Sequence, residues 1–104
     1  MQTATVFDTL RFAEPTTDSE RAIQKAVRAI PSGKVASFEH VARKVGTHAR
    51  AIGNAAARDL NAPMWRVVRK DGTLTWEGDL QVALLTAEGV KLIDGKVDPA
   101  NVLV

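Results

Sequence analysis

The chain has 104 residues, a length typical of one compact domain, with 45% hydrophobic and 25% charged residues. It contains no cysteine, which excludes disulfides, thiolate metal sites and catalysis by a sulfur nucleophile. No apolar run approaches the roughly 20 residues of a membrane-spanning helix, and the first ten residues lack the pattern of a secretory signal. We therefore expect a cytoplasmic protein without a membrane segment.

The formal net charge is only +2, but the charges are segregated along the chain. Residues 21–70 carry eleven basic side chains against Glu39 and Asp59, whereas residues 1–20 and 71–104 are each net acidic. A basic centre between acidic ends favours binding of a polyanion, with DNA as the leading interpretation. A solvated surface with scattered lysines is the alternative.

The first helix is predicted to begin after an N-terminal arm. Residues 1–16 show no clear periodicity and form this arm, while residues 17–104 are expected to be a single domain. The hydroxyl of Thr17 can cap the helix while Glu20 closes a capping box. Apolar residues then recur at helical spacing until Pro31 ends the helix.

Two further helices are predicted on either side of a glycine turn. The second helix covers residues 38–45, where Ser37 is a good N-cap and Gly46 tolerates the left-handed conformation that ends a helix. The third is capped by Thr47 and covers residues 48–60. This arrangement is typical of a helix-turn-helix, which places its second helix in a DNA groove. The side chains of the third helix are small, which permits close approach to DNA and equally suits tight helix packing.

A β-hairpin and a fourth helix are predicted next. Two β-prone runs, residues 64–69 and 73–76, flank a turn signal and predict a hairpin that would serve as a wing. Asp79 is the expected N-cap of a helix over residues 80–88, and the tail from residue 90 to 104 is irregular or forms short strands. The expected fold is mainly α with a small β-hairpin, a winged helix-turn-helix DNA-binding domain.

Five segments, in chain order, resemble one family over roughly residues 20–90. Together they look like the DNA-binding domain of the O6-alkylguanine-DNA alkyltransferases. The segments are Ile30-Pro31-Ser32-Gly33-Lys34-Val35, Ser37-Phe38 with Val41-Ala42, Ala49-Arg50-Ala51-Ile52-Gly53, Pro63-Met64-Trp65-Arg66-Val67-Val68 followed by Asp71-Gly72, and, more weakly, Leu84-Leu85 with Glu88-Gly89-Val90.

The family's alkyl-accepting residue is replaced in this chain. The repair enzymes carry a Pro-Cys-His-Arg-Val segment whose cysteine accepts the alkyl group. Met64 stands at the cysteine position and Trp65 at the histidine position, while Glu88 matches the family's glutamate. A thioether cannot become a thiolate, so self-alkylation by that mechanism is excluded. The chain therefore resembles the alkyltransferase-like proteins, the branch without the cysteine.

That resemblance implies a non-enzymatic protein that binds O6-alkylguanine in duplex DNA by nucleotide flipping and signals to nucleotide excision repair. It makes Arg50 the finger that replaces the extruded nucleotide, since a planar guanidinium can stack on bases. Phe38 matches the family's tyrosine and would press on the target nucleotide. The alternatives are a phosphate contact for Arg50 and a core position for Phe38.

The remaining candidate site residues form a base pocket and a set of DNA contacts. Met64, with a flexible thioether that could pack against an alkyl group, is joined in the expected pocket by Trp65, Val67 and Trp76. A hydrophobic core is the alternative for the tryptophans and is preferred for Trp65. Further DNA contacts are expected from the third-helix residues Thr47, His48, Ala51, Asn54 and Arg58, and from Lys34. Other candidates for the DNA backbone are Arg43, Lys44, Arg66, Arg69 and Lys70, with a buried structural role as the alternative for Arg66.

No metal, cofactor or catalytic residue is expected. His40 and His48 lack a carboxylate or cysteine at ligand spacing, and no glycine-rich phosphate loop is present. The expected partners of this monomer are double-stranded DNA carrying O6-alkylguanine and nucleotide excision repair proteins. One alternative is a regulatory or architectural winged-helix DNA-binding protein without a damaged-base pocket, and another is a protein–protein adaptor in repair.

Overall fold

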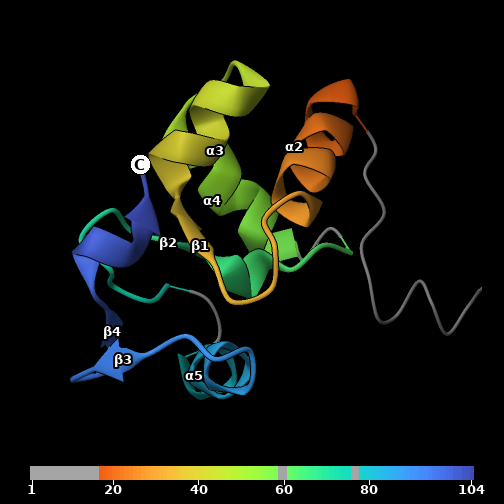
Figure 1. Cartoon of the computed structure of the whole chain (residues 1–104). Helices are drawn as coiled ribbons and strands as arrows, with labels where there is room; N and C mark the ends of the chain where they lie inside the picture. The colour runs from red at the N-terminus through yellow and green to blue at the C-terminus, as the bar shows by residue number, and fades with distance from the viewer. Residues whose placement is uncertain (1–16, 59–60, 76–77) are drawn as a thin grey trace, which may run out of the picture.

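Figure 1 shows the computed structural model of the chain, which describes residues 17–58, 61–75 and 78–104. The expected N-terminal arm, residues 1–16, lies outside the described residues. The helices are α2 (Asp18–Arg28), α3 (Phe38–Val45), α4 (Ala49–Arg58) and α5 (Gly78–Ala87). Short strands and 3-10 turns connect them, namely β1 (Val35–Ser37), η1 (Met64–Arg66), β2 (Val67–Val68), β3 (Leu92–Ile93), β4 (Lys96–Val97), η2 (Pro99–Asn101) and β5 (Val102–Leu103).

Helix α2 begins where the sequence predicts. The Thr17 hydroxyl accepts a hydrogen bond from the Glu20 backbone N–H at 3.0 Å, which confirms its capping role. The Glu20 carboxylate forms an ion pair with Arg58 of α4. Ile23 and Val27 are buried on one face of α2, so the helix packs on its neighbours through the apolar stripe seen in the sequence.

The helix-turn-helix is present. Ser37 caps α3 by accepting a hydrogen bond from the His40 N–H at 3.0 Å, and Gly46 ends it with a φ of 85°. The predicted Thr47 cap is wrong by one residue, because α4 starts at Ala49 and the His48 imidazole Nδ1 accepts from the Ala51 N–H at 3.2 Å. In Figure 1, α2, α3 and α4 gather into one helical layer.

Over the described residues 64–75, the segment predicted as a wing does not form a β-hairpin. Met64–Arg66 form a 3-10 turn, and β2 pairs in parallel with β1, Ala36 opposite Val67. Both residues of β2 are buried, as in a parallel strand covered on two sides rather than the half-exposed arm of a wing. On the other side of β1, β5 also pairs in parallel, so the sheet order is β2-β1-β5.

The antiparallel hairpin of the described residues lies in the tail instead. Strands β3 and β4 pair with Leu92 opposite Val97. The turn between them is Asp94-Gly95, with φ values of 53° and 77°, the left-handed pair that favours a tight hairpin. The mainly helical fold with a small β component is thus confirmed, with the hairpin in a different place from the one predicted.

Alternate strand residues serve two cores on opposite faces of the sheet. Ala36 and Val67 belong to the helical core of α2, α3 and α4. Val35 and Val68 pack with Leu85 of α5 and with residues of the tail. Figure 1 shows α5 and the β3–β4 hairpin away from the helical layer. Helix α5 begins at Gly78, one residue before the predicted cap Asp79. Within the described ranges, every helix is too short or too polar to cross a bilayer.

Candidate nucleic-acid interface

A groove of about 990 Å³ lies where four segments meet. One wall is a face of α4, and the start of α3 adjoins it at Phe38 and Glu39. Residues 69–71 and Thr75, which follow β2, and Leu80 near the start of α5 complete the lining. Segments from both halves of the chain therefore build the groove.

The α4 wall of the groove is made of small residues. Ala49, Gly53 and the neighbouring pair Ala56-Ala57 lie along it. Elsewhere on α4, Ile52 and Ala55 are buried in the helical core. The small side chains of this helix thus serve close packing on one side and leave an open groove on the other. A Cβ built at Gly53 meets nothing within 4 Å, so the chain itself does not require a glycine there.

The groove carries three cations and two carboxylates. Arg50, Arg69 and Lys70 line it, together with Glu39 and Asp71. Side-chain and backbone hydrogen bonds from Thr73 lower the pKa of Asp71, and the charges of Lys96 and Arg69 lower it further. Among the described residues, the ion pairs are Arg21–Asp18, Arg58–Glu20 and Arg66–Glu88, and none of these uses a cation of the groove.

Two predicted DNA-contact residues come together in this groove. Phe38 is half-buried and packs against the helical core, yet it lines the groove together with the exposed Arg50. The core position expected as the alternative for Phe38 is therefore present, and the same residue also lines the groove. Arg50 lies on α4, one turn before Gly53, so it projects from the same helix that supplies the small residues of the groove.

The other predicted contacts lie outside the groove lining. His48 and Asn54 are exposed on the helix-turn-helix, while Thr47 and Ala51 are partly buried. Lys34 is exposed just before β1. Arg58 pairs with Glu20 of α2, and Arg43 donates a hydrogen bond to the Val104 carbonyl.

The predicted base-pocket residues that the structure describes are buried or partly buried in the two cores. Met64 is 0% exposed and Val67 is 1% exposed, both within the helical core and neither in the groove lining. Trp65 is partly buried, and Trp76 lies outside the described residues. The groove residues that the sequence reasoning missed include Thr75 and Leu80. The small residues of α4, three or four positions apart, were the available signal for its groove face.

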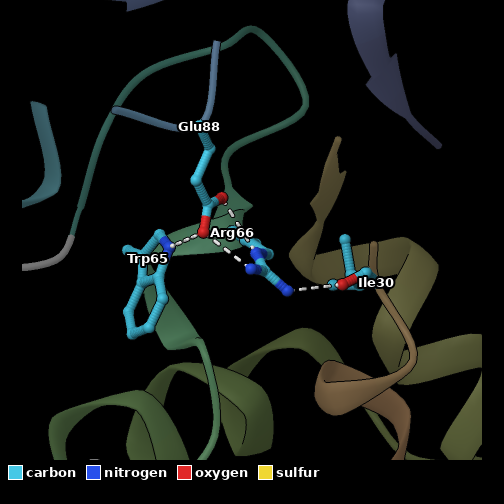
Figure 2. A network of polar contacts seen from close by, with 4 residues as sticks. All are labelled: Ile30, Trp65, Arg66 and Glu88. Carbon is cyan, nitrogen blue, oxygen red and sulfur yellow. Dashed lines mark hydrogen bonds and ion pairs between the residues drawn. The ribbon is translucent and has the colours of Figure 1, made fainter. Parts of the chain in front are cut away.

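Trp65 belongs to a polar network outside the groove lining, shown in Figure 2. Its indole N–H donates to Glu88 Oε2 at 3.1 Å. Arg66 donates to the same carboxylate from Nε at 2.9 Å and from Nη2 at 2.6 Å, and its Nη1 donates to the Ile30 carbonyl at 2.8 Å. The structural alternative for Arg66 is therefore confirmed. The hydrogen bonds from Arg66 outweigh desolvation and hold the pKa of Glu88 below its usual value.

The described residues contain no cluster of three or more His, Asp, Glu or Cys side chains suited to a metal ion. The groove combines three cations with two carboxylates, an aromatic ring and small apolar side chains. The cations suit phosphate oxygens, and the ring and small side chains suit flat bases.

Residues 18–90 match the family described as "6-O-methylguanine DNA methyltransferase, DNA binding domain". The methylated-DNA–protein-cysteine methyltransferase of Salmonella typhimurium is 36% identical over 96 residues, covering 85% of this chain and 56% of that protein. The protein of the same name from Saccharolobus solfataricus is 36% identical over 73 residues, covering 65% and 48%. The chain thus spans about half the length of these curated relatives.

Solved structures show the same similarity. S. pombe Atl1 in complex with damaged DNA containing O6-carboxymethylguanine superposes with a TM-score of 0.74 at 26% identity, covering 84% of this chain and 95% of that one. Mycobacterium tuberculosis OGT in complex with DNA gives a TM-score of 0.66 at 29% identity, covering 78% and 55%. The chain therefore belongs to the family of 6-O-methylguanine DNA methyltransferase DNA-binding domains, within which it is an alkyltransferase-like relative without a cysteine.

Proposed function

We propose that this protein binds duplex DNA and recognises O6-alkylguanine by flipping the modified nucleotide, without repairing it. The observation that carries the proposal is the groove lined together by Phe38, Arg50 and the small residues of α4. A structural relative that matches most of this chain, S. pombe Atl1, was solved with DNA containing O6-carboxymethylguanine.

The α4 wall supports a close approach by DNA. A glycine within a helix costs about 0.5–1 kcal/mol relative to alanine. Gly53 bears this cost although an added Cβ would meet no atom of the chain within 4 Å. We infer that the glycine is present because it leaves room for a binding partner close to the backbone of α4. A DNA groove with α4 lying in it provides such a partner.

The charged and aromatic groups support phosphate binding and nucleotide extrusion. Arg69 and Lys70, which line the groove after β2, can neutralise phosphates. Arg50 is exposed and can enter the base stack, where its guanidinium would bond the orphaned base. Phe38 is held by the core and can press its ring against the extruded nucleotide.

The absence of cysteine supports a non-enzymatic role. The curated relatives are named for transfer to a protein cysteine, and this chain has none. Met64, at the equivalent position, is a fully buried thioether and has no proton to lose. Removal of the lesion would then fall to other proteins. We infer that the protein acts as a monomer that signals the lesion to nucleotide excision repair.

A winged-helix DNA-binding protein without a damaged-base pocket is the second candidate. It is favoured by the burial of Met64 and Val67, two residues predicted to line that pocket, in the helical core. Such a protein would bind DNA through the same groove face but would not distinguish a modified guanine.

The decisive experiment is a fluorescence-anisotropy titration of matched duplexes carrying guanine or O6-methylguanine, each at two salt concentrations. We expect tighter binding to the modified duplex, and a loss of about tenfold in that affinity in Arg50→Ala, since base stacking contributes about 1–3 kcal/mol. Arg21→Ala, an exposed arginine of α2 outside the groove lining, is the matched control. Equal, salt-sensitive binding to both duplexes would support the second candidate.

A label experiment tests the non-enzymatic role separately. The protein is incubated with a duplex whose O6-methyl group is isotopically labelled. The label is expected to stay in the DNA at every protein concentration. Transfer of the label to the protein would disprove the non-enzymatic role and would identify a new acceptor.

A further inference from the structure

The two runs predicted to form a wing start to pair and then separate. The Arg69 N–H donates to the Thr73 carbonyl at 3.0 Å, as in an antiparallel ladder. Continued in register, that ladder would next join the Thr75 N–H to the Val67 carbonyl. In the structure, the Thr75 N–H and the Val67 carbonyl instead both form hydrogen bonds with one side chain of α5.

The inserted side chain is that of Gln81. Its Oε1 accepts from the Thr75 N–H at 3.1 Å, and its Nε2 donates to the carbonyls of Trp65 at 2.9 Å and Val67 at 3.3 Å. One of these carbonyls belongs to the 3-10 turn η1 and the other to β2, so a single amide satisfies backbone acceptors of two consecutive elements. Gln81 is 0% exposed, which makes the amide a wedge between the two arms.

This wedge affects the groove. Thr75 lines the groove, whereas Val67 is buried in the helical core. If Thr75 paired directly with Val67, the segment would be drawn toward β2 and away from its present place in the groove wall. The position of Thr75 therefore depends on the amide of Gln81.

We propose that Gln81 is a positioning residue that holds the Thr75 segment in the groove wall and thereby sets the fit of the groove for a modified nucleotide. The inference rests on the proposed function and adds one residue that does not itself line the groove. A glutamine suits this role because the wedge needs two donors for carbonyls and one acceptor for an N–H. An apolar side chain of similar length would leave these buried groups without that partner.

The test uses Gln81→Met, which keeps the length of the side chain and removes the amide. Hydrogen exchange of the Thr75 amide, followed by NMR, reports the wedge directly. Anisotropy titrations with guanine and O6-methylguanine duplexes report its consequence. Thr86→Ala, an exposed change on the same helix, is the control. We expect fast exchange at Thr75 and a loss of about tenfold in the preference for the modified duplex, with the salt dependence retained.

A second pair of variants protects the test against misfolding of Gln81→Met. Thr75→Pro removes the N–H that Gln81 accepts, whereas Thr75→Ala removes only the side chain. Both change an exposed residue. The preference for the modified duplex is expected to be lower in Thr75→Pro than in Thr75→Ala.

Either of two results would overturn the inference while leaving the proposed function intact. One is an unchanged preference in Gln81→Met although Thr75 exchange has become fast, and the other is equal preference in Thr75→Pro and Thr75→Ala. A wild-type chain without any preference would instead overturn the proposed function itself, before a variant is made.

Discussion

The indole N–H of Trp65 donates a hydrogen bond to Glu88 Oε2 at 3.1 Å, which joins η1 to the C-terminal end of α5. Arg66 donates to both oxygens of the same carboxylate and also to the Ile30 carbonyl. In relatives of the repair type, a histidine stands at the position of Trp65. An indole N–H can only donate, so the contact fixes geometry here and cannot relay a proton.

Glu88→Gln is expected to destabilise the fold by about 3 kcal/mol, because it leaves the guanidinium of Arg66 largely buried without its counter-charge. The Arg66 and Glu88 side chains are each only 15% exposed, so water compensates poorly. Urea unfolding at pH 7 measures the loss. Asp18→Asn, which breaks an exposed ion pair with Arg21, is the control and should change stability by less than about 1 kcal/mol. Equal losses of stability in Glu88→Gln and Asp18→Asn would show that burial does not strengthen the Arg66–Glu88 ion pair.

The same carboxylate predicts a pH dependence. Hydrogen bonds from Arg66 and Trp65 lower the pKa of Glu88 in the folded state from a usual value of 4.5. Because the unfolded chain then binds protons more readily, the stabilisation is fully present above the unfolded pKa and is lost as the pH falls through the lowered folded pKa. The midpoint temperature of thermal unfolding, measured from pH 7 to pH 3, should therefore decrease once the pH drops below about 5. The fall should be shallower in Glu88→Gln, and parallel curves for the two proteins would exclude Glu88 as its source.

Gly72 joins the turn after β2 to the tail hairpin. The Val97 N–H donates to the Gly72 carbonyl at 3.0 Å, and a Cβ at Gly72 would lie 1.8 Å from the Val97 carbonyl oxygen. Gly72→Ala is therefore expected to destabilise the fold by about 3 kcal/mol or more, through backbone displacement added to strain at a φ of 90°.

Gly46→Ala is the matched comparison for this substitution. Gly46 has a φ of 85°, but a Cβ there meets nothing within 4 Å. Gly46→Ala should therefore lower the stability of the fold only by the conformational strain, about 1 kcal/mol. Denaturant unfolding measures the loss of stability in each variant. Equal losses in Gly72→Ala and Gly46→Ala would refute the argument from the close contact with Val97.

The helices could be predicted from the sequence because their signals are local. Ser37 and Gly46 mark the two ends of α3, and Thr17 marks the start of α2. The strand pairing could not be predicted in this way. β1 finds its partners at Val67 and Val102, and such long-range parallel pairing leaves no local pattern.

The candidate site also contains residues that could be predicted from the sequence and residues that could not. The family resemblance singles out Arg50 and Phe38, and both residues line one groove. Met64 was expected in a base pocket but packs in the core, because a 3-10 turn replaces the extended segment assumed for it. The wedge formed by Gln81 had no signal in the sequence, since a single glutamine in an apolar helix does not reveal the backbone groups it will meet.

Gly53 offers a test that separates DNA binding from folding. Gly53→Ala should raise the free energy of unfolding by about 0.5–1 kcal/mol, since alanine favours the helix and the added methyl meets no atom of the chain. The same methyl would stand between α4 and bound DNA, and overpacking of about 1–2 kcal/mol would weaken duplex binding by about tenfold. Ser19→Ala, an exposed change in α2, should bring a similar helix benefit without a binding loss. Because stability and affinity move in opposite directions, partial unfolding cannot imitate the result. A more stable Gly53→Ala protein with unchanged affinity for DNA would show that DNA does not approach this wall of α4.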